Sequence, residues 1–228
     1  YEESVRKARR LVDVKTIEHT DAREVGAENV CLQAIRELQI DKFLQRQGWT
    51  ERKIQSTLSS LIIRTVYASS EWKSLRLMEE NSAAMELLTG NFEDCPTQRE
   101  VYAAAPELYA LKEDLERHLC RRTDSLFNLT NRIMLFDLTN FYFEGSKRQS
   151  AKAKFGRSKE KRSDCKLLVL ALAINTKGFI RYSSILEGNT ADPQSLPDMV
   201  ERIIARNPVS RNSEEKVLVV VDAGIATE

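Results

Sequence analysis

Two aspartates stand where strand-forming segments rarely carry charge. Asp137 follows the apolar residues 133–136, and Asp222 follows the fully apolar residues 217–221 and precedes a glycine turn. A carboxylate inside an apolar strand is costly unless a cation, hydrogen-bond donors or water accompany it. An aspartate at the carboxyl end of a strand stands where open α/β sheets place ligands, although it can also cap a helix or form a turn. We therefore expect a cation, hydrogen-bond donors or a water-filled cleft at Asp137, and we expect Asp222 to face a ligand.

Together the two carboxylates could hold divalent cations. Mg²⁺ prefers oxygen ligands and keeps coordination places for water and phosphate. Two such ions about 4 Å apart can activate the attacking oxygen and stabilise the leaving oxygen of an in-line displacement at phosphorus. One aspartate on a first strand and another after the helix-linked strand of a β-β-β-α-β unit fit this chemistry. Asp137 and Asp222 are therefore the candidate catalytic residues and metal ligands.

A strongly basic stretch lies between these aspartates. Residues 146–166 hold nine basic and two acidic residues, whereas the whole chain has a net charge of +1. Spaced cations neutralise phosphates and bind DNA without sequence preference, although such a stretch can also be a solvated loop. The candidate DNA-binding residues are Lys147, Arg148, Lys152, Lys154, Arg157, Lys159, Lys161 and Arg162.

Length and composition fit a folded protein without a membrane segment. The chain has 228 residues, of which 42% are hydrophobic and 30% charged, with 35 Lys and Arg against 34 Asp and Glu. Its longest apolar run, Leu167–Ile174, has eight residues, whereas a spanning helix needs about 20. The four cysteines include no C-x-x-C pair, which favours reduced thiols over a zinc site. Collagen-like, low-complexity and membrane-spanning classes are thereby excluded.

Residues 1–130 have the pattern of a helical region. Apolar residues recur every three or four positions, most clearly from Ile54 to Val66. Thr50 stands where the N-cap of that helix belongs, because its hydroxyl can accept from the free amides of the first turn. In an earlier helix, the spacing of Val30, Ala34 and Leu38 predicts a buried stripe, which Cys31 and Ile35 widen.

From residue 131 the pattern changes to strands. Strands are predicted over 133–143, 167–174, 179–186 and 217–221, with a helix over 192–206. Because a helical crossover precedes the last strand, we expect that strand to be buried on both faces. The fold class is α+β: an all-helical N-terminal region, 1–130, followed by an incomplete α/β domain, 131–228, in the order β-β-β-α-β.

Four blocks of this sequence resemble a known family. They are Phe136–Gly145 (FDLTNFYFEG), Gly156–Arg162 (GRSKEKR), Glu187–Thr190 (EGNT) and Val221–Glu228 (VDAGIATE). In this order they resemble the DDE transposases of bacterial insertion sequences, of the insertion-sequence-four type. The segment Tyr67–Leu88 also resembles the region that precedes the catalytic domain in this group.

The resemblance implies a ribonuclease-H-like catalytic domain over 131–228 and a DNA-binding role for the helical region 1–130. Asp137 and Asp222 would be the first two metal-binding acids, with Mg²⁺ or Mn²⁺ as the cofactor. The partners would be insertion-sequence ends and target DNA, bound by a homodimer in the bacterial cytoplasm, in association with the nucleoid. The third acid of the family, a Glu on a later helix, has no counterpart here. We therefore expect a truncated enzyme that does not turn over alone.

Two other functions fit parts of the sequence. A non-catalytic DNA-binding remnant would use the helices and the basic stretch, with idle acids. Metal-dependent thermal stabilisation would separate this alternative from the enzyme, since a ligand that binds only the native form raises the Tm. A phosphatase with an aspartyl nucleophile would use Asp137, but this chemistry needs a second acid two residues later, where Thr139 stands.

Overall fold

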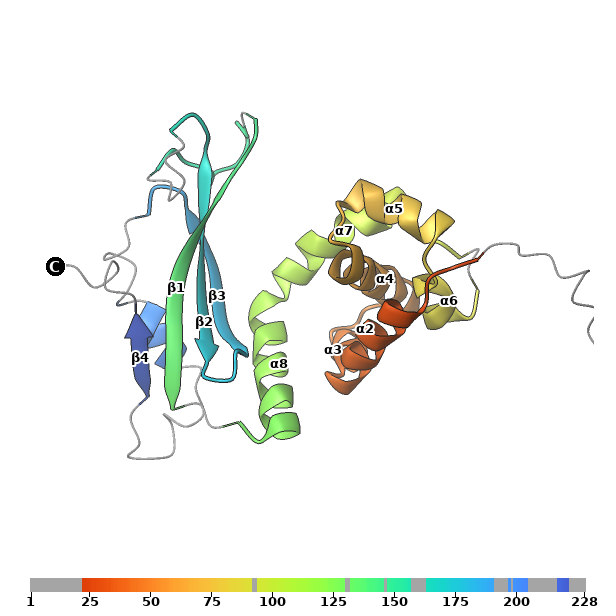
Figure 1. Ribbon diagram of the computed structural model, residues 1–228, viewed down its shortest axis with the longest axis horizontal. Coiled ribbons are helices and arrows are strands. Elements are labelled where there is room, and N and C mark those ends of the chain that lie inside the picture. Colours follow the sequence, from red (N-terminus) through yellow and green to blue (C-terminus); the bar gives the residue numbers. More distant parts are fainter. Residues whose placement is uncertain are drawn as a thin grey trace, which may run out of the picture. The chain divides into compact units, whose positions relative to one another are not determined.

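The regular elements change from helix to strand along the chain, as the sequence pattern predicts (Figure 1). Tertiary contacts divide the chain into a helical unit, Tyr1–Ala110, and a sheet unit, Leu111–Glu228. The protein is therefore α+β overall. The computed structural model describes residues 22–91, 94–129, 132–145, 147–156, 163–190, 197, 199–204 and 217–221.

Six helices form the described part of the helical unit. They are α2 (Gly26–Glu37), α3 (Ile40–Arg46), α4 (Glu51–Tyr67), α5 (Glu71–Glu80), α6 (Ala84–Thr89) and α7 (Gln98–Ala110). The long α4 is central to the packing, because it contacts each of the other five helices. Within the described ranges, no helix is long and apolar enough to cross a membrane.

Local sequence sets the ends of α4. Thr50 has an extended backbone, and its hydroxyl accepts from the Lys53 amide at 3.4 Å, so the predicted N-cap is confirmed. Ala68 ends the helix in the left-handed conformation with φ of 47°. Ile54 and Leu58 are buried, as their helical spacing predicts.

The buried face of α2 differs from the predicted stripe. Ile35 is buried as predicted, but Val30 is 71% exposed and Ala34 is also exposed, whereas Leu32 is buried; the predicted stripe is therefore wrong at Val30 and Ala34. The cause is a polar residue on the buried face. Glu28 is only 1% exposed, and its carboxylate accepts from the Tyr67 hydroxyl at 2.9 Å and the Ala83 amide at 2.8 Å. Because a glutamate lies on the buried face, the spacing of apolar residues alone does not identify that face.

The sheet unit contains the predicted order of elements. Because α8 packs against β3, the division of tertiary contacts falls between Ala110 and Leu111, ahead of the change from helix to strand near residue 130. The elements are α8 (Lys112–Phe127), β1 (Ile133–Tyr142), β2 (Leu167–Asn175), β3 (Ile180–Glu187), a helical segment at 199–204, and β4 (Leu218–Val221).

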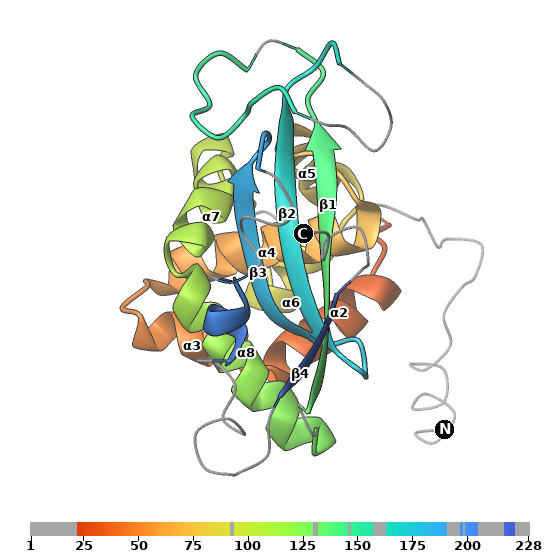
Figure 2. The same ribbon diagram turned by 90° about the vertical axis from the view of Figure 1, so that its left-hand side faces the viewer.

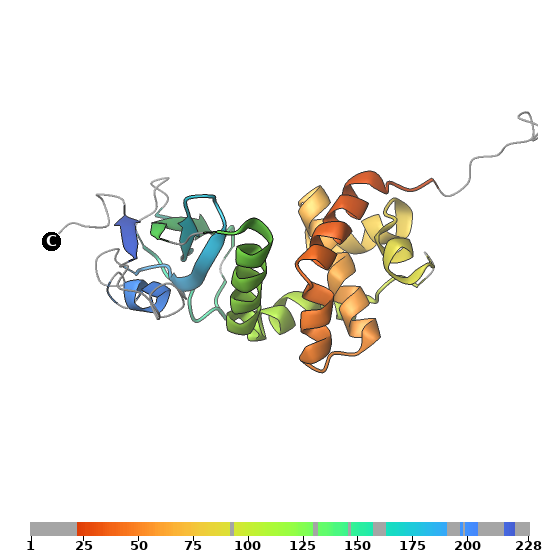
Figure 3. The same cartoon turned by 90° about the horizontal axis from the view of Figure 1, so that it is seen from below.

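The four strands form one mixed sheet in the order β3-β2-β1-β4 (Figure 2). β2 pairs antiparallel with both β1 and β3, whereas β4 pairs parallel with β1. A parallel neighbour requires a crossover connection, and the helical segment 199–204 lies in that connection, against one face of the sheet (Figure 3). The core on this face comprises Met134, Phe136, Leu138, Val169, Ala171, Ala173, Tyr182, Met199 and Ile203.

The opposite face, here called the open face, carries Ile133, Leu135, Asp137, Thr139 and Phe141 of β1. In β4, Val219 and Val221 pack against the core, but Leu218 is 59% and Val220 44% exposed on the open face. The prediction that this strand is buried on both faces is therefore wrong. β4 lies at the edge of the described sheet, and the crossover helix covers only the core face.

Candidate functional site

Asp137 lies in the middle of β1 on the open face. Burial alternates along this strand, so that Phe136 and Leu138 point into the core and Asp137 between them is exposed. Its partner across the antiparallel ladder is Leu172 of β2. Access to water, one of the arrangements expected for Asp137, is observed, because β1 is apolar on both faces and the aspartate occupies the face that the core does not use. Its carboxylate is accessible from solvent.

β4 runs beside β1 in the same direction. The parallel register pairs Ile133 with Leu218 and Phe136 with Val221. The chain therefore reaches the end of β4 next to the residue that precedes Asp137. Asp222, the other predicted metal ligand, lies outside the described residues.

The side chains of β4 point alternately to the two faces of the sheet. Val221 packs against the core and Val220 is exposed on the open face. Side chains of successive strand residues point to opposite faces, and neighbouring strands lie about 4.8 Å apart. A residue that continues β4 beyond Val221 would therefore point to the open face, beside Asp137.

An exposed carboxylate on a paired strand suits a hard divalent cation. Mg²⁺ usually keeps several water ligands and takes only one or two protein carboxylates, so a solvent-accessible Asp137 is compatible with such an ion. Among the described residues, no group of three or more His, Cys, Asp or Glu side chains could hold a metal ion. Of the two predicted ligands, the described ranges therefore include only Asp137.

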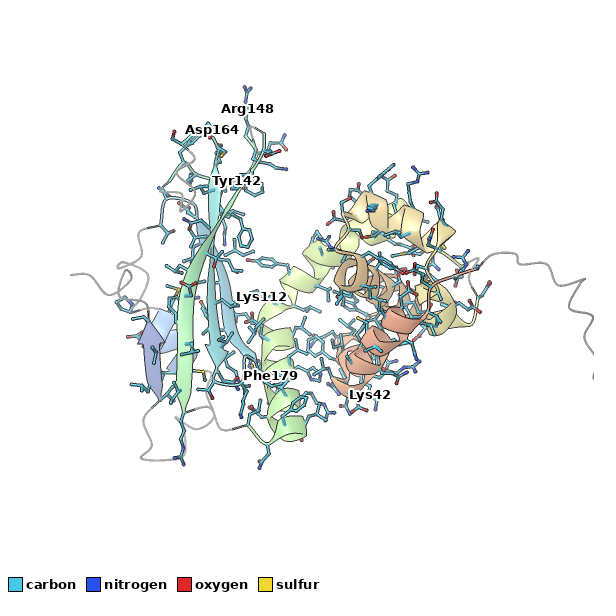
Figure 4. The ribbon with its side chains drawn as sticks, viewed as in Figure 1. Lys42, Lys112, Tyr142, Arg148, Asp164 and Phe179 are labelled. Atoms are coloured by element: carbon cyan, nitrogen blue, oxygen red, sulfur yellow. The ribbon has the colours of Figure 1, made fainter. Side chains whose placement is uncertain are left out.

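Of the described cations of the basic stretch, Arg148 lies beyond the end of β1 (Figure 4), and the backbone of Lys154 pairs with Leu167, opposite the last residue of β1. Lys147, Arg148 and Lys154 are exposed. Asp137 is separated from Tyr142, the last residue of β1, by about 17 Å of strand at roughly 3.4 Å per residue. The structure therefore does not bring these cations next to Asp137. Outside the described residues lie Arg157, Lys159, Lys161 and Arg162.

Lys152 differs from its basic neighbours because its ammonium group has a partner in the sheet. Its Nζ donates to the backbone oxygen of Ile185 at 2.7 Å, and Nζ of Lys112 donates to that of Ser183 at 2.6 Å. These carbonyls are two residues apart on β3, whose other edge pairs with β2. Lysine side chains therefore occupy acceptors that an additional strand would need.

Two glycines have a role that the sequence reasoning missed. A Cβ on Gly156 would lie 1.9 Å from the oxygen of Gly188, and a Cβ on Gly188 would lie 2.1 Å from the oxygen of Leu167. Lys154 and Leu167 exchange backbone hydrogen bonds of 3.2 and 2.7 Å beside this contact. Because the glycines have no side chain, the backbone of the basic stretch can pack closely against the start of β2 and the end of β3. Their presence in the GRSKEKR and EGNT blocks was the available signal.

In the helical unit, an ion-pair cluster joins α4 to α7. Nε of Arg52 donates to Glu100 at 2.7 Å, and its Nη1 contacts Asp94 at 2.6 Å. The hydrogen bond from Arg52 lowers the pKa of Glu100 to about 2, and the same bond raises the pKa of Arg52. This cation therefore serves the packing of its own unit. That residues 1–130 bind DNA stays a prediction.

No protein-family model, no curated protein and no solved structure matches this chain. The functional proposal therefore depends on the residues and strands described above.

Proposed function

We propose that this chain is part of a DDE-type DNA transposase, which binds insertion-sequence ends and catalyses metal-dependent DNA cleavage and strand transfer. The supporting observation is the parallel register of β1 and β4, in which Phe136 pairs with Val221. The residues that follow these two in the chain are Asp137 and Asp222. A pair of carboxylates on neighbouring strands and one face is what a shared divalent ion needs.

In the proposed site, Asp222 would continue β4 and stand beside Asp137. Its Cα is one peptide, about 3.8 Å, from that of Val221. Alternation would turn its carboxylate to the open face, because Val221 packs against the core. Pairing of β1 with β2 and β4 fixes the backbone on both sides of Phe136, the residue that precedes Asp137.

In the proposed site, the aspartates and the basic residues would have different roles. Asp137 and Asp222 would hold Mg²⁺ or Mn²⁺, which when bound would activate the attacking oxygen and stabilise the leaving oxygen at the scissile phosphate. Lys147, Arg148 and Lys154 would neutralise phosphates farther along the DNA. The separation of about 17 Å along β1 corresponds to about five nucleotides at roughly 3.4 Å each.

Mn²⁺ binding tests this proposal without requiring turnover. Calorimetric titration of the full chain is expected to show binding that Asp137→Asn and Asp222→Asn each weaken by roughly tenfold or more. The control is Glu187→Gln, an exposed carboxylate at the end of β3 that should leave the affinity unchanged. Each substitution keeps the size of the side chain, so that a loss of affinity reports the carboxylate.

Fe²⁺ in place of Mn²⁺ locates the ion. After addition of hydrogen peroxide and ascorbate, bound Fe²⁺ reduces the peroxide to hydroxide and a hydroxyl radical, and these radicals are expected to cut the backbone near both residue 137 and residue 222. Wild-type Mn²⁺ affinity in both variants, or cleavage near only one aspartate, would contradict the shared site. Unchanged DNA binding with no metal dependence would instead favour the DNA-binding remnant.

A further inference from the structure

A pocket of about 390 Å³ lies beyond the end of β1, away from Asp137. Its lining includes Phe143, Glu144, Phe155 and Asp164, and Figure 4 shows Asp164 at this end of the sheet. Its volume falls in the roughly 300–1,000 Å³ range of small-molecule sites. The site just proposed for metal-dependent chemistry makes no use of this pocket.

Backbone contacts fix the walls of the pocket. The Phe143 amide donates to the oxygen of Lys166 at 2.9 Å, which ties the end of β1 to the start of β2. Phe155 lies between Lys154, whose backbone pairs with Leu167, and Gly156, which touches Gly188. The aromatic residues of the pocket are therefore held by strand ends.

The pocket combines an exposed aromatic ring with nearby cations. Phe155 is 61% exposed, so its ring is available for contact with a ligand. Nζ of Lys147 lies 5.4 Å from the ring centroid of Phe143, and Lys166 also lines the pocket. Proteins that bind single strands combine these features, because bases stack on aromatic rings while cations contact the phosphates.

The acidic residues of the lining indicate which part of a nucleotide would enter. Glu144 and Asp164 would repel a phosphate from the pocket. A carboxylate can instead accept a hydrogen bond from the amino group of a base. The exposed Lys147 and Arg148 belong to the adjoining segment, where a sugar-phosphate backbone outside the pocket could pass.

We propose that this pocket binds an unpaired base of single-stranded DNA, which stacks on Phe155 while neighbouring lysine and arginine side chains contact the flanking phosphates. Base pairing in a duplex hides the base, so the site distinguishes single strands from duplexes. The site is separate from the aspartates and needs no metal ion.

Anisotropy titrations in EDTA test the proposal with a labelled 12-nucleotide single strand and the blunt duplex of the same sequence. Phe155→Ala is expected to weaken single-strand binding about 5- to 100-fold, because one stacked base is lost. Duplex affinity and the salt dependence should stay unchanged, since the phosphate contacts remain. Phe155→Trp should retain single-strand affinity, and Ile180→Ala removes a similarly exposed apolar side chain near the hairpin between β2 and β3 as the control.

Thermal melting of each variant confirms that the fold is kept. Single-strand affinity within twofold of wild type in folded Phe155→Ala would overturn the proposal, as would equal losses for single strand and duplex. Because the titrations contain EDTA, they do not depend on the proposed metal site, so the failure of this site and the failure of the metal site give different results.

Discussion

Two pairs of polar side chains, one pair from each unit, have different surroundings. In the helical unit, Glu28 is buried and accepts from Tyr67, while Arg23 donates to three backbone oxygens at the end of α5. In the sheet unit, Asp137 is exposed on the open face and Arg148 is exposed beyond the end of β1. These polar groups of the helical unit stabilise its packing, whereas those of the sheet unit are accessible to a ligand. Substitutions in the two units should therefore have different consequences.

The largest expected effect is the loss of the buried carboxylate of Glu28. Glu28→Ala should destabilise the protein by roughly 2–4 kcal/mol, because the buried Ala83 amide loses its acceptor and the Tyr67 hydroxyl keeps only Glu24. Asp137→Ala should change the free energy of unfolding by only about 0.5 kcal/mol, since this residue is exposed. Urea unfolding measures both. Equal losses would show that the contrast between the units is wrong.

A smaller loss is expected at the glycine contact of the sheet unit. Gly188→Ala should cost roughly 1–3 kcal/mol, because the new Cβ would lie 2.1 Å from the oxygen of Leu167 and the backbone must move. Gly26→Ala is the matched control, because a Cβ there meets nothing within 4 Å and helix propensity favours alanine. The midpoint of thermal unfolding should fall for the first and stay or rise for the second. A neutral Gly188→Ala would contradict the close backbone contact.

Sequence patterns predicted the helices and strands well, but they predicted poorly which side chains of each element are buried. The N-cap at Thr50 and the order of the strands follow from residues that are neighbours in sequence. The face of Asp137 does not, because Leu135 and Phe136 give β1 apolar residues on both sides. Burial of Glu28 depends on Ala83, 55 residues away, which no periodicity reveals.

For the candidate site, the sequence indicated the residues but not their arrangement in space. An apolar strand before each aspartate indicated Asp137 and Asp222, but the spatial relation of Asp137 to the described cations depends on the length of β1. Because Asp222 lies outside the described residues, its pairing with Asp137 stays a prediction. The contact of Gly156 with Gly188 joins segments that are distant in sequence, so that only the fold explains both glycines.

The ion-pair cluster of the helical unit should make its stability depend on acid. The ordinary pKa of a glutamate is 4.5, and the hydrogen bond from Arg52 lowers the pKa of Glu100 to about 2. The stabilisation is therefore complete above about pH 4.5 and is lost as the pH falls toward 2. Because both side chains are partly solvent-exposed, we expect a loss of about 1 kcal/mol. Between pH 6 and 2.5, the urea midpoint should fall less for Glu100→Gln than for the wild type. If the two midpoints fell in parallel with pH, protonation of Glu100 would be excluded as the cause.

The smallest expected effect compares two lysines of the basic stretch. Both lysines are exposed, but the Lys152 side chain donates to the backbone of β3, whereas Lys154 pairs with Leu167 through its backbone. Lys152→Ala should cost about 0.5–1 kcal/mol, because Ile185 loses a charged donor. Lys154→Ala should leave stability unchanged and lower the salt slope of duplex DNA binding by about one unit, as expected for one phosphate contact.

Within one segment, one lysine would thus stabilise the fold and the other would contact a ligand. Lys152 would act as Arg52 does, through the packing of its own unit, and Lys154 would act through DNA. Lys152→Ala also exposes an acceptor on the edge of β3, so analytical ultracentrifugation should show more self-association for it than for Lys154→Ala. If instead Lys152→Ala lowered the salt slope and left stability intact, the contact with Ile185 would be incidental, and both lysines would belong to the DNA-binding surface.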